Sequence, residues 1–530
     1  EGKIMTLLYH LLRDGYFPKE LPPVYNTYSY SKLMCMKPLP SDFDEKKITK
    51  SVEHNIALVG TSRRKLSIPN PIAYFFLCKK IDDSWNELEK IATSSQLSKS
   101  KPIRATNPID RALKPNNPIN DIPKWRAQYR MGSRYLLKAD VRNYYRSIYT
   151  HSIPWAMHTK SVAKIRRNSH DLLGNNLDKL VRNCQDSQTI GIPVGPDTSY
   201  LISEILLCCI DNIIIKEFSE KTKSELKGFR WMDDYELCFS NSHHAEIALN
   251  CIESALSQFE LGLNPSKTQI RELPIALEEH WARELRIFQI RNSEAQLNDG
   301  IGFFSRAFEL AKENPERPVL RYAIRRFRNS MLTDKALKKT VWPILQDLML
   351  ECVINEPGTI SHVINIFIKF SNNGYKMRLD QLRDVLNCQI NNHAPLGHGS
   401  EVAWSLWGAI LFNLQLNTES SKAISKIEDS IVALLALDAE SRGLFEEPLE
   451  KSHWSQYMNN DSLYGEQWLL SYEANVENWI SSEDKNHVNS DNIFKYLKNN
   501  GVKFYNTSIT IKKMPYKPVS EEGNYYNLSN

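Results

Sequence analysis

Three aspartates are the residues of this sequence whose type and spacing could do chemistry. Asp140 ends the apolar run YLLKAD, and Asp233 and Asp234 are adjacent in the aromatic-rich segment FRWMDDYELCF. An unpartnered carboxylate is costly to bury, and two adjacent carboxylates repel each other. A divalent cation resolves both problems, because Mg²⁺ prefers oxygen ligands and takes one or two protein carboxylates together with phosphates. Two such ions about 4 Å apart would form the clamp for in-line phosphoryl transfer.

The elements around these acids predict how they are positioned. Residues 135–141 are typical of a buried strand, and residues 229–239 of two short strands that turn at the two acids. Helices are expected over 197–218 and 243–259, and a turn over 261–270 leads into a further strand. An Asp-Asp pair alone is more often a solvated turn, so the metal-site interpretation depends on these surroundings.

Beyond about residue 280 the pattern changes to amphipathic helices joined by short polar loops, for example over 402–416, 424–437 and 466–480. Stacked helix pairs would explain such a series. We therefore expect an α+β protein with a mixed domain over residues 1–290 and an all-helical, repeat-like domain over residues 291–530.

Composition agrees with a folded protein. The chain has 530 residues, of which 42% are hydrophobic and 24% charged, and this excludes a wholly disordered protein. Its nine cysteines are scattered without a CxxC pair, which argues against a disulfide framework or a zinc site and for a reducing compartment. No stretch approaches about 18 uncharged apolar residues, and the start lacks a signal peptide's apolar core. We expect a soluble cytoplasmic protein without a membrane partner.

The net charge of +5 is unevenly distributed. Residues 101–150 hold eleven Lys/Arg against three acids, and residues 301–350 hold ten against five. Residues 401–480 hold four Lys/Arg against thirteen acids. Basic surfaces attract phosphate backbones, although charge runs are more often solvated faces. We expect the basic stretches to line a nucleic-acid channel and the acidic stretch to face solvent or another subunit.

Further segments complete an ordered series around the acids. RKLSIP stands at 64–69, DVRNYYR at 140–146, GIPVGPDTSYLISEILL at 191–207 and LNPSKT at 263–268, with the Asp pair between the last two. In this order and at this spacing they resemble the palm motifs of reverse transcriptases, and residues 64–69 resemble the fingers segment R-P-L-G-I-P of that family. The resemblance implies a fold with reverse-transcriptase-type fingers and palm.

The resemblance also implies a metal centre. Asp140 and Asp233 would be the principal Mg²⁺ ligands, with Asp234 as a weaker partner and the main-chain carbonyl of Val141 as a further ligand. Two ions are implied, and Mn²⁺ can substitute. Lys267 matches the lysine that protonates the leaving pyrophosphate; its alternative is an exposed turn residue.

Other positions match the nucleotide site of that family. Tyr145 falls at the steric gate, where its ring would crowd a ribose 2′-hydroxyl and favour dNTPs; its alternative is a core aromatic. Arg64, assisted by Arg63 or Lys65, would bind the triphosphate, because guanidinium groups fit phosphate oxygens; their alternative is a solvated turn. The floor beneath the nucleotide would be formed by Gly191, Pro193, Val194 and Gly195.

Two positions depart from the family pattern. Val194 stands where reverse transcriptases usually carry Gln, and Trp231 stands where the double-Asp motif usually begins with Tyr. The valine removes a polar group near the incoming base, which puts ordinary templated synthesis in doubt.

ELPPVYNT at 20–27, SIPNPIAY at 67–74, SIYTHSIPWAMHTK at 147–160 and GIPVGPDTS at 191–199 resemble a narrower group. These are the bacterial antiviral reverse transcriptases, the abortive-infection and defence-associated AbiK-like proteins. That resemblance implies a helical C-terminal domain in place of a thumb, homo-oligomers and a role against phage. It also implies dNTPs as substrates, a noncoding RNA template or untemplated single-stranded DNA as product, and priming from a tyrosine, for which Tyr525 and Tyr526 are candidates.

The function predicted from the sequence is a DNA polymerase of reverse-transcriptase type that acts in antiphage defence. The first alternative is a template-independent nucleotidyl transferase on the same fold, which Val194 favours. The second, of another class, is an RNA-binding assembly scaffold with a vestigial site, which the intact set of three acids disfavours.

Overall fold

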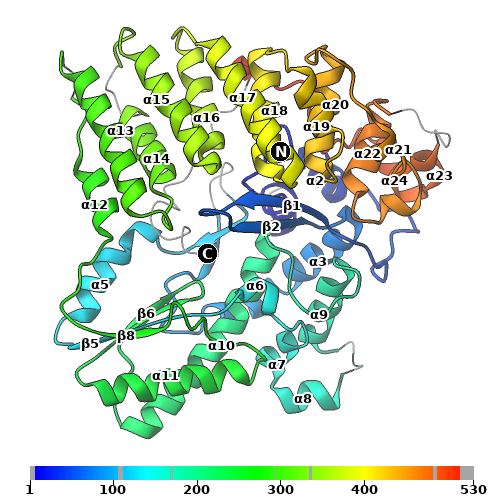
Figure 1. Ribbon diagram of the computed structural model, residues 1–530. Helices are drawn as coiled ribbons and strands as arrows, with labels where there is room; N and C mark the ends of the chain where they lie inside the picture. Colours follow the sequence, from blue (N-terminus) through cyan, green and yellow to red (C-terminus); the bar gives the residue numbers. More distant parts are fainter. Residues whose placement is uncertain are drawn as a thin grey trace.

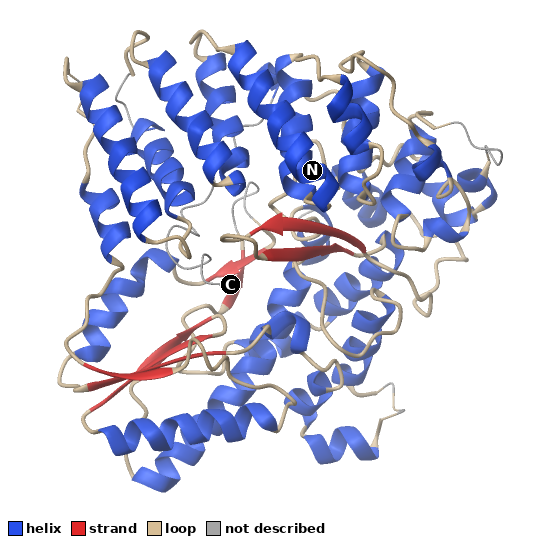
Figure 2. Cartoon of the chain, in the orientation of Figure 1, coloured by secondary structure: helices blue, strands red, loops and turns tan. Residues whose placement is uncertain are grey.

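The three-dimensional structure is a computed structural model that describes residues 6–105, 111–167, 169, 171–291, 293–332, 337–480 and 486–513. Strands and helices alternate in the first part of the chain, and helices alone follow in the second (Figures 1 and 2). The fold class is therefore α+β, as the sequence predicts. The helical series stands as an arc of neighbouring helices over the strand-containing part, with a two-stranded hairpin between them (Figure 2).

The elements of the first part of the chain are α1 Leu7–Arg13, α2 Tyr28–Met36, β1 Val52–Ala57, β2 Arg63–Ile68, α3 Pro71–Asp83, α4 Trp85–Ala92, β3 Pro102–Arg104, β4 Leu113–Pro115, α5 Ile122–Arg130, β5 Tyr135–Asp140, α6 Tyr144–Ser147, α7 Ser152–His158, α8 Lys160–Ile165, α9 Leu173–Asn183, α10 Asp197–Thr222, β6 Gly228–Trp231, β7 Asp234–Phe239, α11 Ser242–Ser257 and β8 Gln269–Glu272.

The helical series comprises α12 His280–Ile287, α13 Gln296–Glu313, α14 Val319–Leu332, α15 Trp342–Asn355, α16 Ile360–Asn372, α17 Leu379–His393, α18 Gly399–Phe412, α19 Thr418–Ile424, α20 Ser430–Ser441, α21 Ser452–Ser455, α22 Trp468–Val476, α23 His487–Ser490 and α24 Asn492–Asn499.

The central sheet is four-stranded and antiparallel, in the order β6-β7-β5-β8. The strands predicted over 135–141 and 229–239 are confirmed as β5 and as the hairpin β6–β7. The helices predicted over 197–218 and 243–259 are confirmed as α10 and α11, which pack against each other below the sheet (Figure 1). The turn predicted over 261–270 leads, as expected, into the edge strand β8.

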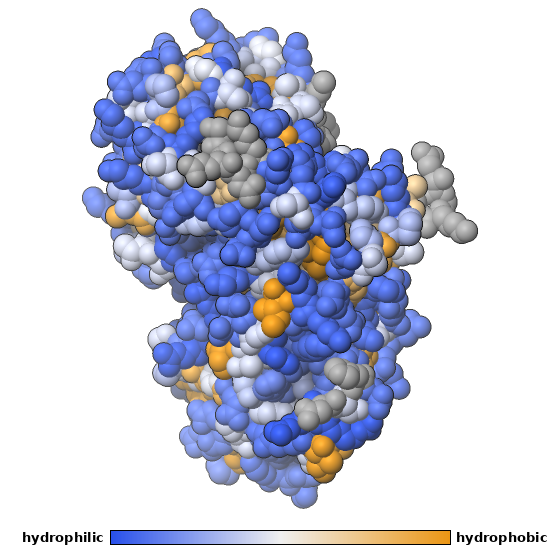
Figure 3. Space-filling model, turned by 90° about the vertical axis from the view of Figure 1, so that its right-hand side faces the viewer, coloured by the Kyte–Doolittle hydropathy of each residue, from blue (hydrophilic) through white to orange (hydrophobic). Residues whose placement is uncertain are grey.

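Helix α10 departs from the expectation that no segment is long and apolar enough to cross a membrane. By length and composition alone it could do so. However, 78% of its most apolar window is buried inside the protein, as in a core helix. One face of the molecule is largely hydrophilic, with apolar side chains in small separate groups (Figure 3). Two acids near its middle, Glu204 and Asp211, are fully buried.

The basic segment at residues 63–68 is a strand rather than the turn that its composition indicates. It forms the hairpin β1–β2, in which Ile56 pairs with Arg64. Leu66 and Ile68 are buried, while the intervening side chains are more exposed. This alternation places a core face on one side of the strand and polar side chains on the other. The solvated turn given as the alternative for these basic residues does not form, and a run of three basic residues had concealed the two-residue period.

The helices predicted over 402–416, 424–437 and 466–480 correspond to α18, α20 and α22, each shorter than or displaced from its predicted range. Every residue of α18 is buried, because α16, α17, α20 and β1 surround it. One continuous core runs from the first helix to the last segments. Trp468 of α22, for example, donates from Nε1 to the carbonyl of Ile68 at 3.1 Å. The division near residue 290 therefore stays a prediction.

The expectation that the acidic stretch 401–480 faces outward holds for most of its acids, among them Glu419, Glu446 and Glu466, but not for four of them. Glu401, Asp429, Asp438 and Glu473 are buried. Each buried acid has a hydrogen-bond donor from a distant part of the chain or from a neighbouring turn, which offsets the cost of burial. The donor atoms are Arg63 Nη2 for Glu401, His54 Nδ1 for Asp429, Tyr505 Oη for Asp438 and the amide of Phe504 for Glu473.

Glu473 predicts a pH-dependent stability. Burial raises the pKa of its carboxyl to about 8, against about 4.3 in an unfolded chain. The folded protein therefore binds a proton that the unfolded chain releases between these values, and its stability should fall as pH rises through this window. Glu473→Gln keeps the neutral shape, so its unfolding midpoint in urea should exceed that of the wild type by an amount that grows from pH 5 to pH 8.

Glu466→Gln is the control, because Glu466 is 67% exposed and its ion pair with Lys50 lies at the surface. It should leave the pH profile of the midpoint unchanged. Parallel profiles for the wild type and Glu473→Gln would show that Glu473 is ionised in the folded protein.

Candidate active site

Strand register brings the three acids together. Asp140 is the last residue of β5, and its antiparallel partner is Asp234, the first residue of β7. Asp233 lies in the two-residue turn that joins β6 to β7, and its carbonyl accepts a hydrogen bond from the amide of Val141 at 3.3 Å. Asp140 is 2% exposed, and the other two acids are half-buried. The structure therefore places all four predicted metal-site residues at one edge of the sheet.

The carboxylates disfavour one another's ionisation. Burial and then Asp140 raise the pKa of Asp233 to about 6. Burial, then Asp233 and Asp140, raise the pKa of Asp234 well above its ordinary value. Such a crowded, poorly solvated set of acids is the donor set that a divalent cation fits.

The turn that follows α11 contributes two further groups. Lys267 Nζ lies 3.5 Å from Asp140 Oδ1, so the predicted lysine does reach the acids. Asn264 Nδ2 donates to Asp140 Oδ2 at 3.1 Å, and the amide of Asn264 donates to the carbonyl of Asp140 at 2.8 Å. No role was predicted for Asn264 from the sequence, although this residue lies within the LNPSKT motif. This side chain fixes the orientation of the Asp140 carboxylate.

A buried arginine holds the hairpin that carries Asp233. The side chain of Arg230, on β6, is fully buried between two acids of α10. Its Nη1 donates to Glu204 at 3.0 Å, and its Nε donates to Asp211 at 2.9 Å. Two carboxylates and one guanidinium leave this set with a formal surplus of negative charge. Hydroxyl groups bind the same acids: Ser98 and Ser100 donate to Glu204, and Ser95 and Tyr235 donate to Asp211.

The same arginine constrains the turn. Met232 has a φ of 51°, which is uncommon for a residue other than glycine and costs free energy. Arg230 Nη1 donates to the carbonyl of Met232 at 2.6 Å, and the amide of Met232 donates to Ser100 Oγ at 2.8 Å. Both polar groups of the strained residue are thereby held. The sequence signal for this network was a pair of acids seven residues apart on an otherwise apolar helix.

The predicted steric-gate residue lies beside the acids. Tyr145 is on the short helix α6 and is half-buried. Its Oη lies 3.3 Å from Ser203 Oγ. Burial raises the pKa of Tyr145, and the negative charge of Asp233 acts in the same direction. The ring is therefore close to the metal-site acids but remains partly accessible.

Residues 191–195, which include Gly191 and Pro193, precede α10 and form backbone hydrogen bonds with two other elements. These elements are α6 and the β1–β2 hairpin, which we call the fingers hairpin. The amide of Ile192 donates to the carbonyl of Tyr145 at 2.9 Å, and the carbonyl of Val194 accepts from Ser67 of β2 at 2.8 Å. Gly195 has a φ of 126°, and a Cβ there would meet Pro18 Cγ at 2.6 Å. Glycine is therefore required at this position by both conformation and space.

Strand β2 separates the three basic residues that the sequence grouped. Burial raises the pKa of Asp233 and of Tyr145, and the charge of Arg64 opposes both shifts, so Arg64 lies near these two residues. Arg63 instead binds Glu401 of α18, with Nη2 2.7 Å from Oε2, and Lys65 Nζ lies 2.6 Å from Glu53. Successive strand residues point to opposite faces, so one of the three reaches the site. Arg63 is thus bound by Glu401 and Lys65 by Glu53, and triphosphate binding by these two residues stays a prediction.

Removing the buried arginine should destabilise the protein. Arg230→Gln would leave the carboxylates of Glu204 and Asp211 buried without their counter-charge, a change that costs about 3–5 kcal/mol. We expect a clear fall in the urea midpoint of unfolding. The control is Arg134→Gln, because Arg134 is 72% exposed and its ion pair with Glu272 lies on the surface. Equal midpoints for the two variants would show that the buried set is not needed for stability.

Residues 80–288 match the family described as reverse transcriptase (RNA-dependent DNA polymerase). No curated protein matches the chain. Among solved structures, telomerase from Candida albicans in complex with a TWJ fragment of telomeric RNA is similar at 13% identity and a TM-score of 0.30, over 62% of this chain and 63% of that chain. Apo telomerase from Candida tropicalis is similar at 12% identity and a TM-score of 0.33, over 63% and 68%. The chain thus spans about two thirds of these proteins' length. Residues 80–288 are a reverse transcriptase domain, the domain of an RNA-directed DNA polymerase, which is a nucleotidyltransferase.

Proposed function

We propose that this chain is a reverse transcriptase that adds dNTPs by two-metal phosphoryl transfer in bacterial antiphage defence. The catalytic part of this proposal rests on the proximity of Asp140, Asp233 and Asp234 within a segment that matches the reverse transcriptase family. The defence role rests on the sequence motifs that resemble the antiviral group. Three crowded acids in place also weigh against a vestigial scaffold.

The acids would hold two Mg²⁺ ions, or Mn²⁺ in their place, with the carbonyl of Val141 as a further ligand. Bound there, the ions would lower the pKa of the attacking hydroxyl and neutralise charge on the leaving pyrophosphate. Lys267, 3.5 Å from Asp140, is placed to give that pyrophosphate a proton. Beyond this, the protein would position the reacting groups and stabilise the charge that develops on the phosphates, which are the main requirements of phosphoryl transfer.

The nucleotide would lie between the acids and the fingers hairpin. Arg64 faces this space from β2 and would bind the triphosphate. Tyr145 would crowd a ribose 2′-hydroxyl, which favours dNTPs. Residues 191–195 would form the floor, where Val194 presents an apolar side chain. That side chain supports the second candidate function, untemplated synthesis of single-stranded DNA.

Helix α14 carries the densest group of arginines in the basic stretch 301–350. Arg321, Arg325 and Arg328 recur at intervals of four and three residues and therefore share one face of the helix. Burial, then Arg321 and Arg328, lower the pKa of Arg325 to about 10. Arg321 and Arg328 are nevertheless buried, and Arg321 pairs with Glu356, so these two arginines do not by themselves form a nucleic-acid surface.

The other basic stretch contributes less than its composition suggests. Within residues 101–150, Arg126 is buried and bound to Glu236, and Arg111 is paired with Asp197 at 2.6 Å. These cations hold the palm together and do not face a channel.

The remaining parts of the proposal rest on the sequence motifs. They are a noncoding RNA template, a tyrosine primer, a homo-oligomeric assembly and a cytoplasmic location. Tyr525 and Tyr526, the candidate primers, lie outside the described residues. A purified sample can test template and primer together.

We expect purified protein with Mg²⁺ and labelled dNTPs to make DNA, and Asp233→Asn to reduce incorporation by about 100-fold or more, because a metal ligand is lost. The readout is label in extractable polymer and label on denatured protein. The control is Asp171→Asn, an acid 86% exposed. Sensitivity to RNase pretreatment would indicate a bound RNA template, and label that stays on denatured protein would indicate a tyrosine primer.

If added RNA and primers also give no incorporation, the polymerase proposal fails and the scaffold is favoured. If Asp233→Asn and the wild type incorporate equally, the acids are not the catalytic centre.

Arg64→Gln should raise KM for dNTPs about tenfold or more, the loss expected for one charge-assisted hydrogen bond to phosphate. Lys65→Gln is the matched control on the same strand, since Lys65 is 53% exposed and paired with Glu53. Steady-state kinetics over a range of dNTP concentrations measure both. A larger KM change in the lysine variant would reverse the assignment.

A further inference from the structure

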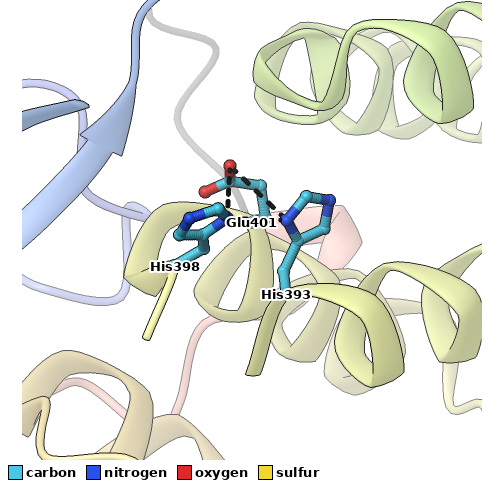
Figure 4. A group of neighbouring side chains, drawn as sticks. All are labelled: His393, His398 and Glu401. Carbon is cyan, nitrogen blue, oxygen red and sulfur yellow. Dashed lines mark hydrogen bonds and ion pairs between the residues drawn. The ribbon is translucent and has the colours of Figure 1, made fainter. Parts of the chain in front are cut away.

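A second group of metal-ligand side chains lies in the helical series, remote in sequence from the catalytic acids. His393 Nδ1 and His398 Nδ1 are 2.9 Å apart. Glu401 Oε1 lies 4.0 Å from each of these atoms. Figure 4 shows the two imidazole rings and the carboxylate pointing toward one another. The three groups therefore converge on one small volume.

The local chain conformation builds this arrangement. His393 is the last residue of α17, and a short turn over 394–398 leads into α18. Gly397 has a φ of 65°, a left-handed conformation that favours glycine, and the amide of His398 donates back to the carbonyl of His393 at 3.1 Å. His398 and Glu401 are three residues apart at the start of α18 and so lie on the same side. The backbone conformation of residues 393–401 therefore fixes the positions from which the three side chains extend.

We propose that His393, His398 and Glu401 bind one divalent transition-metal ion of the Zn²⁺ class. Two imidazole nitrogens and one carboxylate form an accepted ligand set for such ions, with water completing the shell. Two nitrogens bound to one tetrahedral zinc lie about 3.3 Å apart, given bonds of about 2.0–2.1 Å. The observed separation of 2.9 Å needs only a small adjustment. At 2.9 Å the two Nδ1 atoms share a hydrogen bond, whose proton a bound ion would replace.

The carboxylate is already oriented for this task. Glu401 Oε2 accepts from Arg63 Nη2 at 2.7 Å and from Ser400 Oγ at 2.6 Å. Partners of this kind are typical around ligating carboxylates, because they hold the ligand in place. Arg63 also contacts Oε1. Its positive charge opposes a bound cation, so we expect weaker binding than at a site without a neighbouring guanidinium.

The group is accessible to an ion from solvent. The side chains of His393 and His398 are 15% and 23% exposed, whereas Glu401 is 1% exposed. An ion would thus reach the two histidines from solvent, and the buried Glu401 would coordinate it from the interior side.

The position of the site gives the ion a structural role. The amide of Gly399 donates to Asn55 Oδ1 at 3.1 Å, and the amide of Ala57 donates to Ser400 Oγ at 3.3 Å. Together with the Arg63–Glu401 ion pair, these bonds attach the β1–β2 hairpin to the start of α18. An ion that fixes residues 393–401 would therefore stabilise the attachment of the hairpin, and this inference does not depend on polymerase activity.

The test is metal binding to the full chain. Protein freed of metal with EDTA is titrated with Zn²⁺ by calorimetry in excess Mg²⁺, on an Asp233→Asn background that weakens the catalytic acids as a competing site. We expect one Zn²⁺ per chain, an affinity at least tenfold lower in His398→Ala, and a rise in Tm on zinc addition only where the site is intact. His243→Ala is the control, because His243 is exposed and lies elsewhere, at the start of α11.

A second measurement does not depend on a variant that folds. X-ray absorption of the zinc-loaded protein should show two imidazole ligands, and Co²⁺ in place of zinc should show the visible absorption of a four-coordinate site. Absence of zinc binding, or equal affinity in His398→Ala and His243→Ala, would overturn the proposal. In that case the cluster is only a hydrogen-bonded joint between the hairpin and α18.

Discussion

The buried contact of Arg230 with Glu204 and Asp211 is the interaction on which the candidate active site depends. It joins β6 to the core helix α10, and through Met232 it holds the strained turn that carries Asp233. A buried charge without a partner is costly, so the three groups can stay buried only if the hairpin remains in this position. The ion pairs of Arg230 with Glu204 and Asp211 thus position the hairpin, and the three candidate metal-binding acids next to it are crowded.

The two sets of acids illustrate opposite uses of burial. Glu204 and Asp211 are matched by a guanidinium and by four hydroxyl donors, so their charges stabilise the fold. The catalytic candidates Asp233 and Asp234 have raised pKa values, because burial and neighbouring carboxylates act in the same direction. This contrast supports a structural role for the first pair and cation binding for the second.

The helical series takes part in the same architecture through the fingers hairpin. One strand of that hairpin sends Arg64 toward the acids and Arg63 toward Glu401, and His54 of the other strand binds Asp429 at 2.8 Å. A continuous core joins these parts. The position of Arg64 therefore depends on packing several hundred residues further along the chain.

The sequence alone determined the α+β class, the strands that bear the acids, and the helices α10 and α11, because two-residue and helical periods and turn residues are local signals. It also indicated the reverse transcriptase motifs in order. Only the tertiary structure decided which of three adjacent basic residues faces the site, that several acids of residues 401–480 point inward, and that Asn264 and Arg230 support the acids. Those outcomes depend on strand pairing and on partners distant in sequence, since the sign and spacing of charges along a chain do not specify which opposite charge will be nearby after folding.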